Sequence, residues 1–519
     1  MKNRFTFSFC SAVVVCFLAA GCASRPTSAD AGQAAAIANR PEKLTYPALT
    51  YEPPDPAKFR VALKSGPVAY VVPDRELPLV NIALLVRTGG YLEPAGKEGL
   101  AELTGYLLAR GGIKSKTAEQ LDERLDFLAA HLASSIGDNQ GSVSLNLMAK
   151  DLDEGLAILR EVLTAPRFQD DKIALRKQQM LQDMKQRNDD SANIEGREYS
   201  FLAFGENFYV NHLTTGASVE AITRADLETF HHRWFDPANF VVAVSGDFDR
   251  DEMIRKLETL FAGWPFKGEK PPPVPTNITF AAPGVYVVDK DVNQGRVDVV
   301  LPGILRDNPD YLAVTVMNDI LGGGGFTARI MNRVRSDEGL AYSAYSSFPG
   351  GIYSPLTFTA EFQSKSRTVA YAASIVLEEM KRIAAEPVSD QELETSKRGF
   401  IDRFPRSFST KTQVAGTFAG DEFTGRYAKQ PDYWKTLRSR LAAVTNDDVE
   451  RVAKKYLTPG KAVILVVGQE AEILKGQPDH PVTLKSLGGD RYTQLPLRDP
   501  LTLKPLPLAG GTKPASPAQ

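Results

Sequence analysis

Histidine is scarce in this chain of 519 residues, and its spacing matters as much as its number. The five copies are His131, His212, His231, His232 and His480, and no two of them stand four residues apart. Two histidines at that spacing on one helix face, with a glutamate beside them, form the usual zinc-and-base set of a helical metallopeptidase site. The sequence therefore excludes that arrangement from any single helix of this chain.

Cysteine is also scarce, and its three copies all stand near the N-terminus, at Cys10, Cys16 and Cys22. A basic start, an apolar run over Phe5–Ala20 and small residues before Cys22 are typical of a secretory signal. No longer apolar run follows, and this one is shorter than the ~20 residues that a membrane-spanning helix needs. We therefore predict a signal peptide over residues 1–21.

The end of this signal, Leu18 followed by Ala19-Ala-Gly-Cys22, resembles a bacterial lipobox with its leucine displaced by one position. The resemblance implies lipidation of Cys22, which would anchor the mature chain durably to a membrane, because lipoproteins carry several acyl chains. Ala23 differs from the aspartate that retains enterobacterial lipoproteins in the inner membrane, so we expect the outer membrane of a bacterial cell envelope, facing the periplasm. The alternative is an ordinary signal peptide with an incidental cysteine.

Neither sign of charge is in surplus, because 61 basic and 63 acidic residues leave a formal charge of −2. This balance offers no basic surface for nucleic acid, and we expect no such partner. The chain is too long for a single core and predicts two or more domains. Residues 22–52, rich in alanine, serine and proline, predict a tether, and residues 486–519 predict a tail that is partly disordered.

An internal repeat is the strongest organisational pattern. Residues 222–246 (ITRADLETFHHRWFDPANFVVAVSG) and 444–468 (VTNDDVERVAKKYLTPGKAVILVVG) align without a gap at an offset of 222. In both, a threonine N-cap opens an acidic helix start, an amphipathic helix stops before proline, and an apolar strand ends at glycine. Two such units in register indicate duplicated domains.

Each half mixes strands and helices, which predicts an α+β fold of two homologous sheet-plus-helix domains in tandem. The proline-rich segment 267–276 predicts a stiff linker between a first domain over residues 53–266 and a second over residues 277–485. The expected strands are 69–72, 80–86, 285–288 and 296–301, and the expected long helices are 151–164, 172–187 and 368–385.

The segment Glu93–Gly112 (EPAGKEGLAELTGYLLARGG) resembles the zinc-binding helix of the insulinase/pitrilysin metallopeptidases, the family of the mitochondrial processing peptidase. The family pattern there is roughly E-P-x-G-K-x-G-L-A-H-x-x-E-H, and the turn and the closing glycines match it. The resemblance covers about residues 53–485 and implies two like domains that form half of a clamshell chamber.

The chemistry of that helix does not match. Glu102 stands where the family has its first zinc histidine, Gly105 where it has the general-base glutamate, and Tyr106 where it has the second histidine. A gapped alignment puts Ala174 at the position of the third ligand. Since at most one ligand remains of the three required, we expect no metal in this chain. We expect a packing helix instead, with a shared apolar face and a C-cap, formed by Leu100, Leu103, Leu107 and Gly111.

A second element is complete. In LGGGGFTARIMNRVRSDEGLAYS, residues 321–343, we expect Thr327 to cap a helix, Gly339 to end it in a left-handed turn, and a strand to start at Tyr342. Arg335 and Tyr342 would then converge and could hold a peptide carbonyl and its developing oxyanion. The alternative is a solvated helix-end cation beside a half-buried strand residue. The segment resembles the family's Arg-x6-Tyr element, which implies contact with substrate opposite the zinc.

Two further patterns in the sequence are weaker. Gly323, Gly324, Gly325 and Phe326 could contact a substrate backbone, or the glycines could only permit a tight helix entry. The adjacent His231 and His232 occupy an ordinary helix face in the repeat, which favours a structural role over metal binding.

The resemblance implies a division of labour, because two-chain members place zinc in one chain and the Arg/Tyr pair in the other. We therefore expect the non-zinc subunit of a heterodimeric envelope metallopeptidase, inactive alone, with a zinc-bearing subunit and extended peptides as partners. The alternative is a catalytically inactive binding or scaffold lipoprotein with the same fold. An autonomous peptidase is disfavoured, because the general base is missing.

Overall fold

The computed structural model describes residues 40, 44, 50–489 and 491–508. The chain divides into two units at Thr50, and the account below concerns the described residues of the second, which begins at Tyr51. The predicted signal peptide and Cys22 lie outside the described residues. None of the helices in the described ranges has the length and apolar content needed to cross a bilayer.

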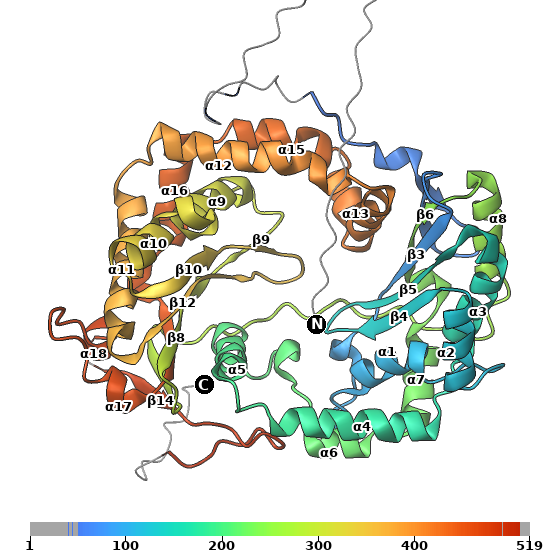
Figure 1. Ribbon diagram of the computed structural model, residues 1–519, viewed down its shortest axis with the longest axis horizontal. Coiled ribbons are helices and arrows are strands. Elements are labelled where there is room, and N and C mark those ends of the chain that lie inside the picture. Colours follow the sequence, from blue (N-terminus) through green and yellow to red (C-terminus); the bar gives the residue numbers. More distant parts are fainter. Residues whose placement is uncertain (1–39, 41–43, 45–49, 490, 509–519) are drawn as a thin grey trace, which may run out of the picture. The chain divides into compact units, whose positions relative to one another are not determined.

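Two six-stranded mixed sheets form the framework of this unit (Figure 1). The first has the order β1-β2-β6-β3-β5-β4 and the second β14-β7-β13-β8-β12-β10. The parallel pair β2/β6 corresponds to the parallel pair β7/β13, and the next three strands are antiparallel in both sheets. The strands of the first sheet are β1 (Arg60–Ala62), β2 (Val68–Pro73), β3 (Leu79–Val86), β4 (His131–Ile136), β5 (Gly141–Met148) and β6 (Phe240–Gly246). Those of the second are β7 (Gly284–Asp289), β8 (Gln294–Pro302), β10 (Ala341–Ser347), β12 (Thr357–Lys365), β13 (Val463–Gly468) and β14 (Thr493–Leu495), and the short strands β9 (Ile304–Leu305) and β11 (Gly350–Gly351) pair separately.

Helices pack on both sheets, which makes the fold α+β as predicted. In the first half they are α1 (Leu100–Arg110), α2 (Ala118–Phe127), α3 (Leu152–Thr164), α4 (Asp170–Lys185), α5 (Ser191–Phe204), α6 (Gly216–Ala221), α7 (Arg224–Trp234) and α8 (Arg250–Phe261). In the second half they are α9 (Tyr311–Asn318), α10 (Arg329–Met331), α11 (Val369–Ala385), α12 (Asp390–Arg403), α13 (Lys411–Phe423), α14 (Arg426–Lys429), α15 (Tyr433–Ala442), α16 (Asn446–Tyr456), α17 (Glu470–Ile473) and α18 (Leu484–Leu487).

The repeat found in the sequence is α7 followed by β6, and α16 followed by β13. Thr223 and Thr445 cap these two helices with the same reciprocal capping box, in which each hydroxyl accepts from the backbone N–H three residues on. Every residue of β6 and of β13 is buried, because each lies inside its sheet with neighbours on both sides. The prediction of two homologous domains is confirmed.

In addition, one helix of each half packs on the sheet of the other half. The helix α13 packs on β2 and β6, where Phe418 contacts Tyr70 and the guanidinium of Arg60 pairs with Glu422 at 2.9 Å. The helix α5 packs on β8 and β13, where Ile194 joins a core cluster of the second sheet. Figure 1 shows α13 beside β3 and β6, and α5 beside β8. This exchange couples the stability of the two halves.

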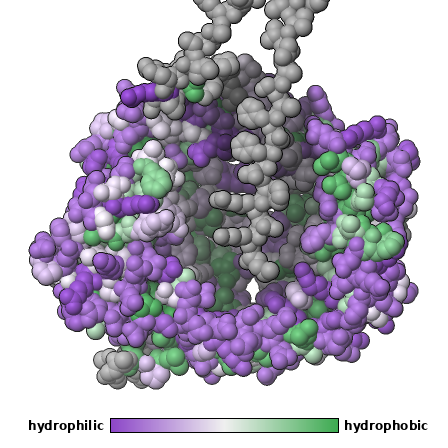
Figure 2. Space-filling model, in the orientation of Figure 1, coloured by the Kyte–Doolittle hydropathy of each residue, from purple (hydrophilic) through white to green (hydrophobic). Residues whose placement is uncertain are grey.

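The elements expected from the sequence are present within a few residues, and two details differ. Thr327 does not cap a helix: its hydroxyl donates to Gly324 O inside a 3₁₀ turn, and the helical residues begin at Arg329 after an uncapped Ala328. The strand β14 lies in the segment expected to be a tail, where it pairs in parallel with β7. The surface in Figure 2 is mostly hydrophilic with scattered hydrophobic patches, because most apolar side chains lie in the cores.

Candidate functional site

The turn before α1 is held by a buried carboxylate. Glu93 accepts from the backbone N–H of Ala101 at 2.7 Å and of Gly99 at 3.1 Å, so it caps the start of the helix. Burial raises the pKa of the Glu93 carboxyl to about 7, although these two hydrogen bonds act in the opposite direction. Lys97 ties the same turn to Asp226 of α7 at 2.7 Å. The turn residues of this segment therefore have a structural role of their own, which is to hold the start of α1.

The helix α1 is a packing helix. Leu100, Leu103 and Leu107 are buried in the core of the first half, and the N–H of Gly111 donates to Leu107 O at the C-cap. Both expectations for this helix are confirmed.

Gly105 lets α1 lie directly against the edge strand β4. A Cβ at Gly105 would lie 2.3 Å from the backbone nitrogen of Ile136 and 2.7 Å from Ser135 C. Ser134 of β4 joins the strand to α1, because its hydroxyl donates to Gly105 O at 2.6 Å and accepts from the N–H of Ala109 at 3.0 Å. A side chain here requires α1 and β4 to move apart, so the backbone packing opposes the glutamate that the resemblance would put at this position.

A guanidinium lies between Glu102 and Tyr106, the two side chains that the resemblance puts at the positions of the zinc histidines. Arg176 of α4 pairs with Glu102 at 2.6 Å, and its Cζ lies 4.5 Å from the ring centroid of Tyr106. Arg110 contacts the same ring at 4.7 Å. The Glu102 carboxylate is therefore already paired with Arg176, and the positive charge of Arg110 beside Tyr106 would repel a metal ion.

This donor set does not fit zinc, which needs three nitrogen, sulfur or carboxylate ligands in tetrahedral geometry. Ala174 is exposed on α4 and has no donor atom in its side chain. Within the described ranges, no group of three His, Cys, Asp or Glu side chains could hold a metal ion. The sequence reasoning missed Arg176, which stands in the sequence only as one of three basic residues among 172–177.

The structure brings Arg335 and Tyr342 together, and it adds Phe326. The Cζ of Arg335 lies 4.7 Å from the ring centroid of Tyr342 and 4.8 Å from that of Phe326. Tyr342 is 85% exposed and Phe326 is 68% exposed. Large aromatic side chains at such exposure, around an arginine, are typical of binding surfaces.

The backbone around this group is irregular. Arg335 lies in a π-helical segment, Asn332–Asp337, and a second one, Asp319–Gly323, contains the start of the glycine run. Gly339 ends the helical segment at a positive φ of 62°, as predicted, and its N–H donates to Arg335 O at 3.1 Å. The pairing of β10 with β12 shifts register between Ala341 and Ala344. π-segments and bulges of this kind cluster at functional sites.

The predicted substrate-binding glycines lie beside this group. Gly323 and Gly325 are exposed, and Gly324 is half-buried and donates from its N–H to Asp319 O at 2.7 Å. Phe326 follows them directly and contacts Arg335. Their role in holding substrate stays a prediction.

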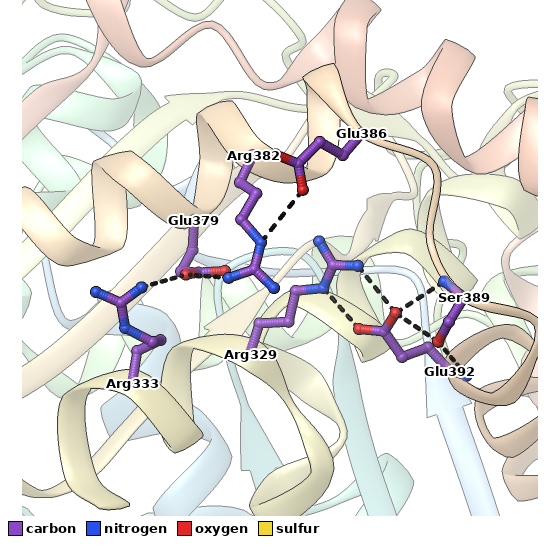
Figure 3. A network of polar contacts seen from close by, with 7 residues as sticks. All are labelled: Arg329, Arg333, Glu379, Arg382, Glu386, Ser389 and Glu392. Atoms are coloured by element: carbon purple, nitrogen blue, oxygen red, sulfur yellow. Dashed lines mark hydrogen bonds and ion pairs between the residues drawn. The ribbon is translucent and has the colours of Figure 1, made fainter. Parts of the chain in front are cut away.

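A polar network anchors the segment that carries Arg335 (Figure 3). Arg329 binds both carboxylate oxygens of Glu392, at 2.7 and 2.9 Å, and Glu392 also caps α12 with Ser389. The side-chain hydrogen bonds from Arg329 lower the pKa of Glu392 to about 2. Arg333 reaches Glu379 of α11 at 3.3 Å, and Glu379 is only 1% exposed. Two ion pairs therefore fix α10 and the following π-segment on α11 and α12.

The paired histidines do not form a site together. His231 is fully buried, and its Nε2 lies 3.1 Å from Leu163 O between the rings of Phe168 and Phe235. Burial lowers the pKa of His231 to about 3, so it is neutral. It is a core histidine of α7.

Comparisons with known sequences agree with this architecture. The family described as Insulinase (Peptidase family M16) matches residues 71–200, and the one described as Peptidase M16 inactive domain matches residues 221–400. Together they span more than half of the chain. The chain belongs to the insulinase family, M16.

Two relatives illustrate the range of this family. An "Uncharacterized zinc protease" of Rickettsia bellii is 24% identical over 330 residues, which are 62% of this chain and 77% of that protein. The "Non-peptidase homolog YmxG" of Helicobacter pylori is 27% identical over 369 residues, which are 70% of this chain and 81% of that protein.

Solved structures share the fold. The peptidase M16 inactive domain protein from Pseudomonas fluorescens superposes with a TM-score of 0.70 at 23% identity, covering 79% of this chain and 97% of that one. A protease from Helicobacter pylori gives a TM-score of 0.66 at 19% identity, covering 79% and 98%. This chain therefore has an insulinase-family fold in which the residues of the zinc helix do not form a zinc site.

Proposed function

We propose that this chain is the zinc-free subunit of a two-chain envelope metallopeptidase, and that Arg335 and Tyr342 contact peptide bound at the zinc site of a partner chain. The contrast between the two elements carries the proposal. Packing at Gly105 and the ion pair of Arg176 exclude zinc chemistry in the first half. In the second half, a half-buried Arg335 and an exposed Tyr342 lie close together, and the segment that carries Arg335 is anchored by the ion pair of Arg329.

The chemistry of the pair suits a peptide bond that is being hydrolysed. Arginine offers a charged, forked donor, and tyrosine offers a neutral hydroxyl donor. Donors placed around a carbonyl oxygen stabilise the negative charge that develops on it, and losing one such donor costs about 10²–10³ in rate. A zinc ion in the partner would supply the activated water.

Lipidation of Cys22 would hold this subunit at the outer membrane, facing the periplasm. The lipobox-like sequence before Cys22 supports this part of the proposal. A Cys22→Ser variant should then fractionate away from membranes, and retention of that variant with the membranes would contradict the anchor.

The second candidate is an inactive binding or scaffold protein. The relative named a non-peptidase homolog favours it, as does the occupation of the former metal position by Arg176. Such a protein would bind peptides at the aromatic group of Phe326 and Tyr342 without assisting their cleavage.

A reconstitution experiment separates these candidates. This chain and a zinc-bearing insulinase-family chain from the same cells are purified alone and together, and cleavage of a quenched fluorescent peptide is measured. We expect activity in the mixture and little in either chain alone. Full activity of the zinc-bearing chain alone would favour the scaffold, and zinc at one per chain with cleavage by this protein alone would restore the autonomous peptidase.

A further inference from the structure

A cavity of about 430 Å³ lies beside Glu102. It is lined by residues of α1, α4 and α5 and by the segment 213–214. Its volume lies in the range of small-ligand pockets, about 300–1,000 Å³. The proposed action of Arg335 at the zinc site of a partner chain does not involve this cavity.

Arg197 of α5 is a buried cation that lines this cavity. Its residue exposure is 8%, its Nε pairs with Glu198 at 2.9 Å, and its Nη1 donates to Asn188 Oδ1 at 3.1 Å. Its Nη2 is buried and has no hydrogen-bond partner among the described residues. A buried guanidinium N–H without an acceptor costs free energy, so a hydrogen-bond acceptor from outside the chain would stabilise this group.

Arg187 is a second cation of the same cavity. Its Nη1 donates to Pro500 O at 3.1 Å, and no carboxylate of the described residues pairs with it. Burial and the positive charge of Arg197 lower the pKa of Arg187, while Glu102 acts in the opposite direction. Two guanidiniums that repel each other around one space favour an anion between them.

The other residues that line the cavity determine which anions it can bind. Met180 and Met184 are buried residues of α4 that supply apolar surface, and Leu213 adds to it. Asp183 also lines the cavity, is exposed, and its carboxylate has no partner among the described residues. Asp183 would repel a multiply charged phosphate, whereas the ammonium group of a ligand would pair with it.

We propose that this cavity binds a short peptide with free termini, whose carboxylate is held by Arg197 and Arg187 and whose amino group is held near Asp183. An apolar side chain of the peptide lies against the methionines. This site is separate from the proposed trans action of Arg335, because it needs no partner chain and no zinc.

The test uses the full chain alone and the dipeptide Ala-Leu as probe, with binding followed by ligand-observed NMR. N-acetyl-Ala-Leu removes the ammonium group, Ala-leucinamide removes the carboxylate, and inorganic phosphate serves as a simple anion. Arg187→Gln removes one cation, Asp183→Asn removes the acid, and Lys185→Gln is the matched control, because Lys185 is exposed and does not line the cavity.

We expect Ala-Leu to bind and Ala-leucinamide to bind at least about tenfold more weakly, because hydrogen bonds to charged groups are strong. Arg187→Gln should weaken Ala-Leu by a similar factor, and Lys185→Gln should not. Asp183→Asn should lower the affinity for Ala-Leu toward that for N-acetyl-Ala-Leu and leave the acetylated peptide unaffected. Absence of binding, equal effects of Arg187→Gln and Lys185→Gln, or displacement of Ala-Leu by equimolar phosphate would overturn the assignment. All these outcomes are obtained without a partner, so they are distinct from failure of the two-chain peptidase.

Discussion

Substituting Gly105 tests whether backbone packing, and not only the loss of ligands, excludes the zinc chemistry. In Gly105→Ala the new Cβ would lie 2.3 Å from Ile136 N and 2.7 Å from Ser135 C, well inside van der Waals contact. Both atoms belong to the backbone of β4, so neither can rotate away, and α1 must separate from the strand. Overpacking of a core costs about 1–3 kcal/mol, occasionally more.

The helix propensity of alanine opposes this cost. Replacing glycine by alanine in a helix interior contributes about 1 kcal/mol of stability. We therefore expect overpacking, set against propensity, to lower the free energy of unfolding of Gly105→Ala by up to about 2 kcal/mol. Loss of the Ser134 hydrogen bonds to Gly105 O and Ala109 N adds to the effect.

The assay is urea denaturation followed by circular dichroism, with Gly196→Ala as the matched control. Gly196 is an exposed residue inside α5, and a Cβ there has no atom within 4 Å. That variant should gain about 0.5–1 kcal/mol. If Gly105→Ala is as stable as the wild type or more stable, then packing does not exclude a side chain. The fourfold change Glu102→His, Gly105→Glu, Tyr106→His and Ala174→Glu, which supplies three ligands and the base, then becomes a fair attempt to restore zinc binding.

Two further predictions concern acidic residues of the second half, Asp298 and Glu392. Burial, and then the charges of Glu195 and Glu361, hold the pKa of the Asp298 carboxyl well above its usual range. The folded protein therefore keeps this carboxyl protonated, and the stability of the wild type falls as pH rises from the unfolded-state pKa towards the folded-state pKa. Asp298→Asn should therefore become more stable relative to the wild type between pH 5 and pH 8, by up to about 1.4 kcal/mol per pH unit, and a difference that stays constant in urea denaturation would contradict this. Glu392→Gln should weaken the two hydrogen bonds to Arg329 and speed amide exchange over residues 329–337, and unchanged protection there would show that the network does not anchor the Arg335 segment.

The sequence predicts the duplicated framework well, because the signals that carry it are local. Threonine caps, acidic first turns and apolar runs that end at glycine specify α7–β6 and α16–β13, and both units form with the same capping box. The approach of Arg335 to Tyr342 follows in the same way from one helix end, one glycine turn and one strand start.

What the sequence could not show depends on contacts between distant segments. Arg176 reaches Glu102 only because α4 turns that face toward α1, whereas the alignment pointed to Ala174, two residues earlier. The exchange of α5 and α13 and the addition of β14 to the second sheet are equally non-local. The failure of Thr327 as an N-cap has a local cause, since the glycine run continues into a 3₁₀ turn that takes up its hydroxyl.

The most direct test of the divided active site is the effect of Arg335→Ala on kcat/KM of the reconstituted two-chain complex. Arg440→Ala is the control, because Arg440 is exposed on α15 and far along the chain from the site. We expect Arg335→Ala to lower kcat/KM by about 10²–10³, with assembly and thermal stability retained, and Arg440→Ala to leave it unchanged. Equal turnover by the wild-type and Arg335→Ala complexes would contradict a role for this chain in the chemistry.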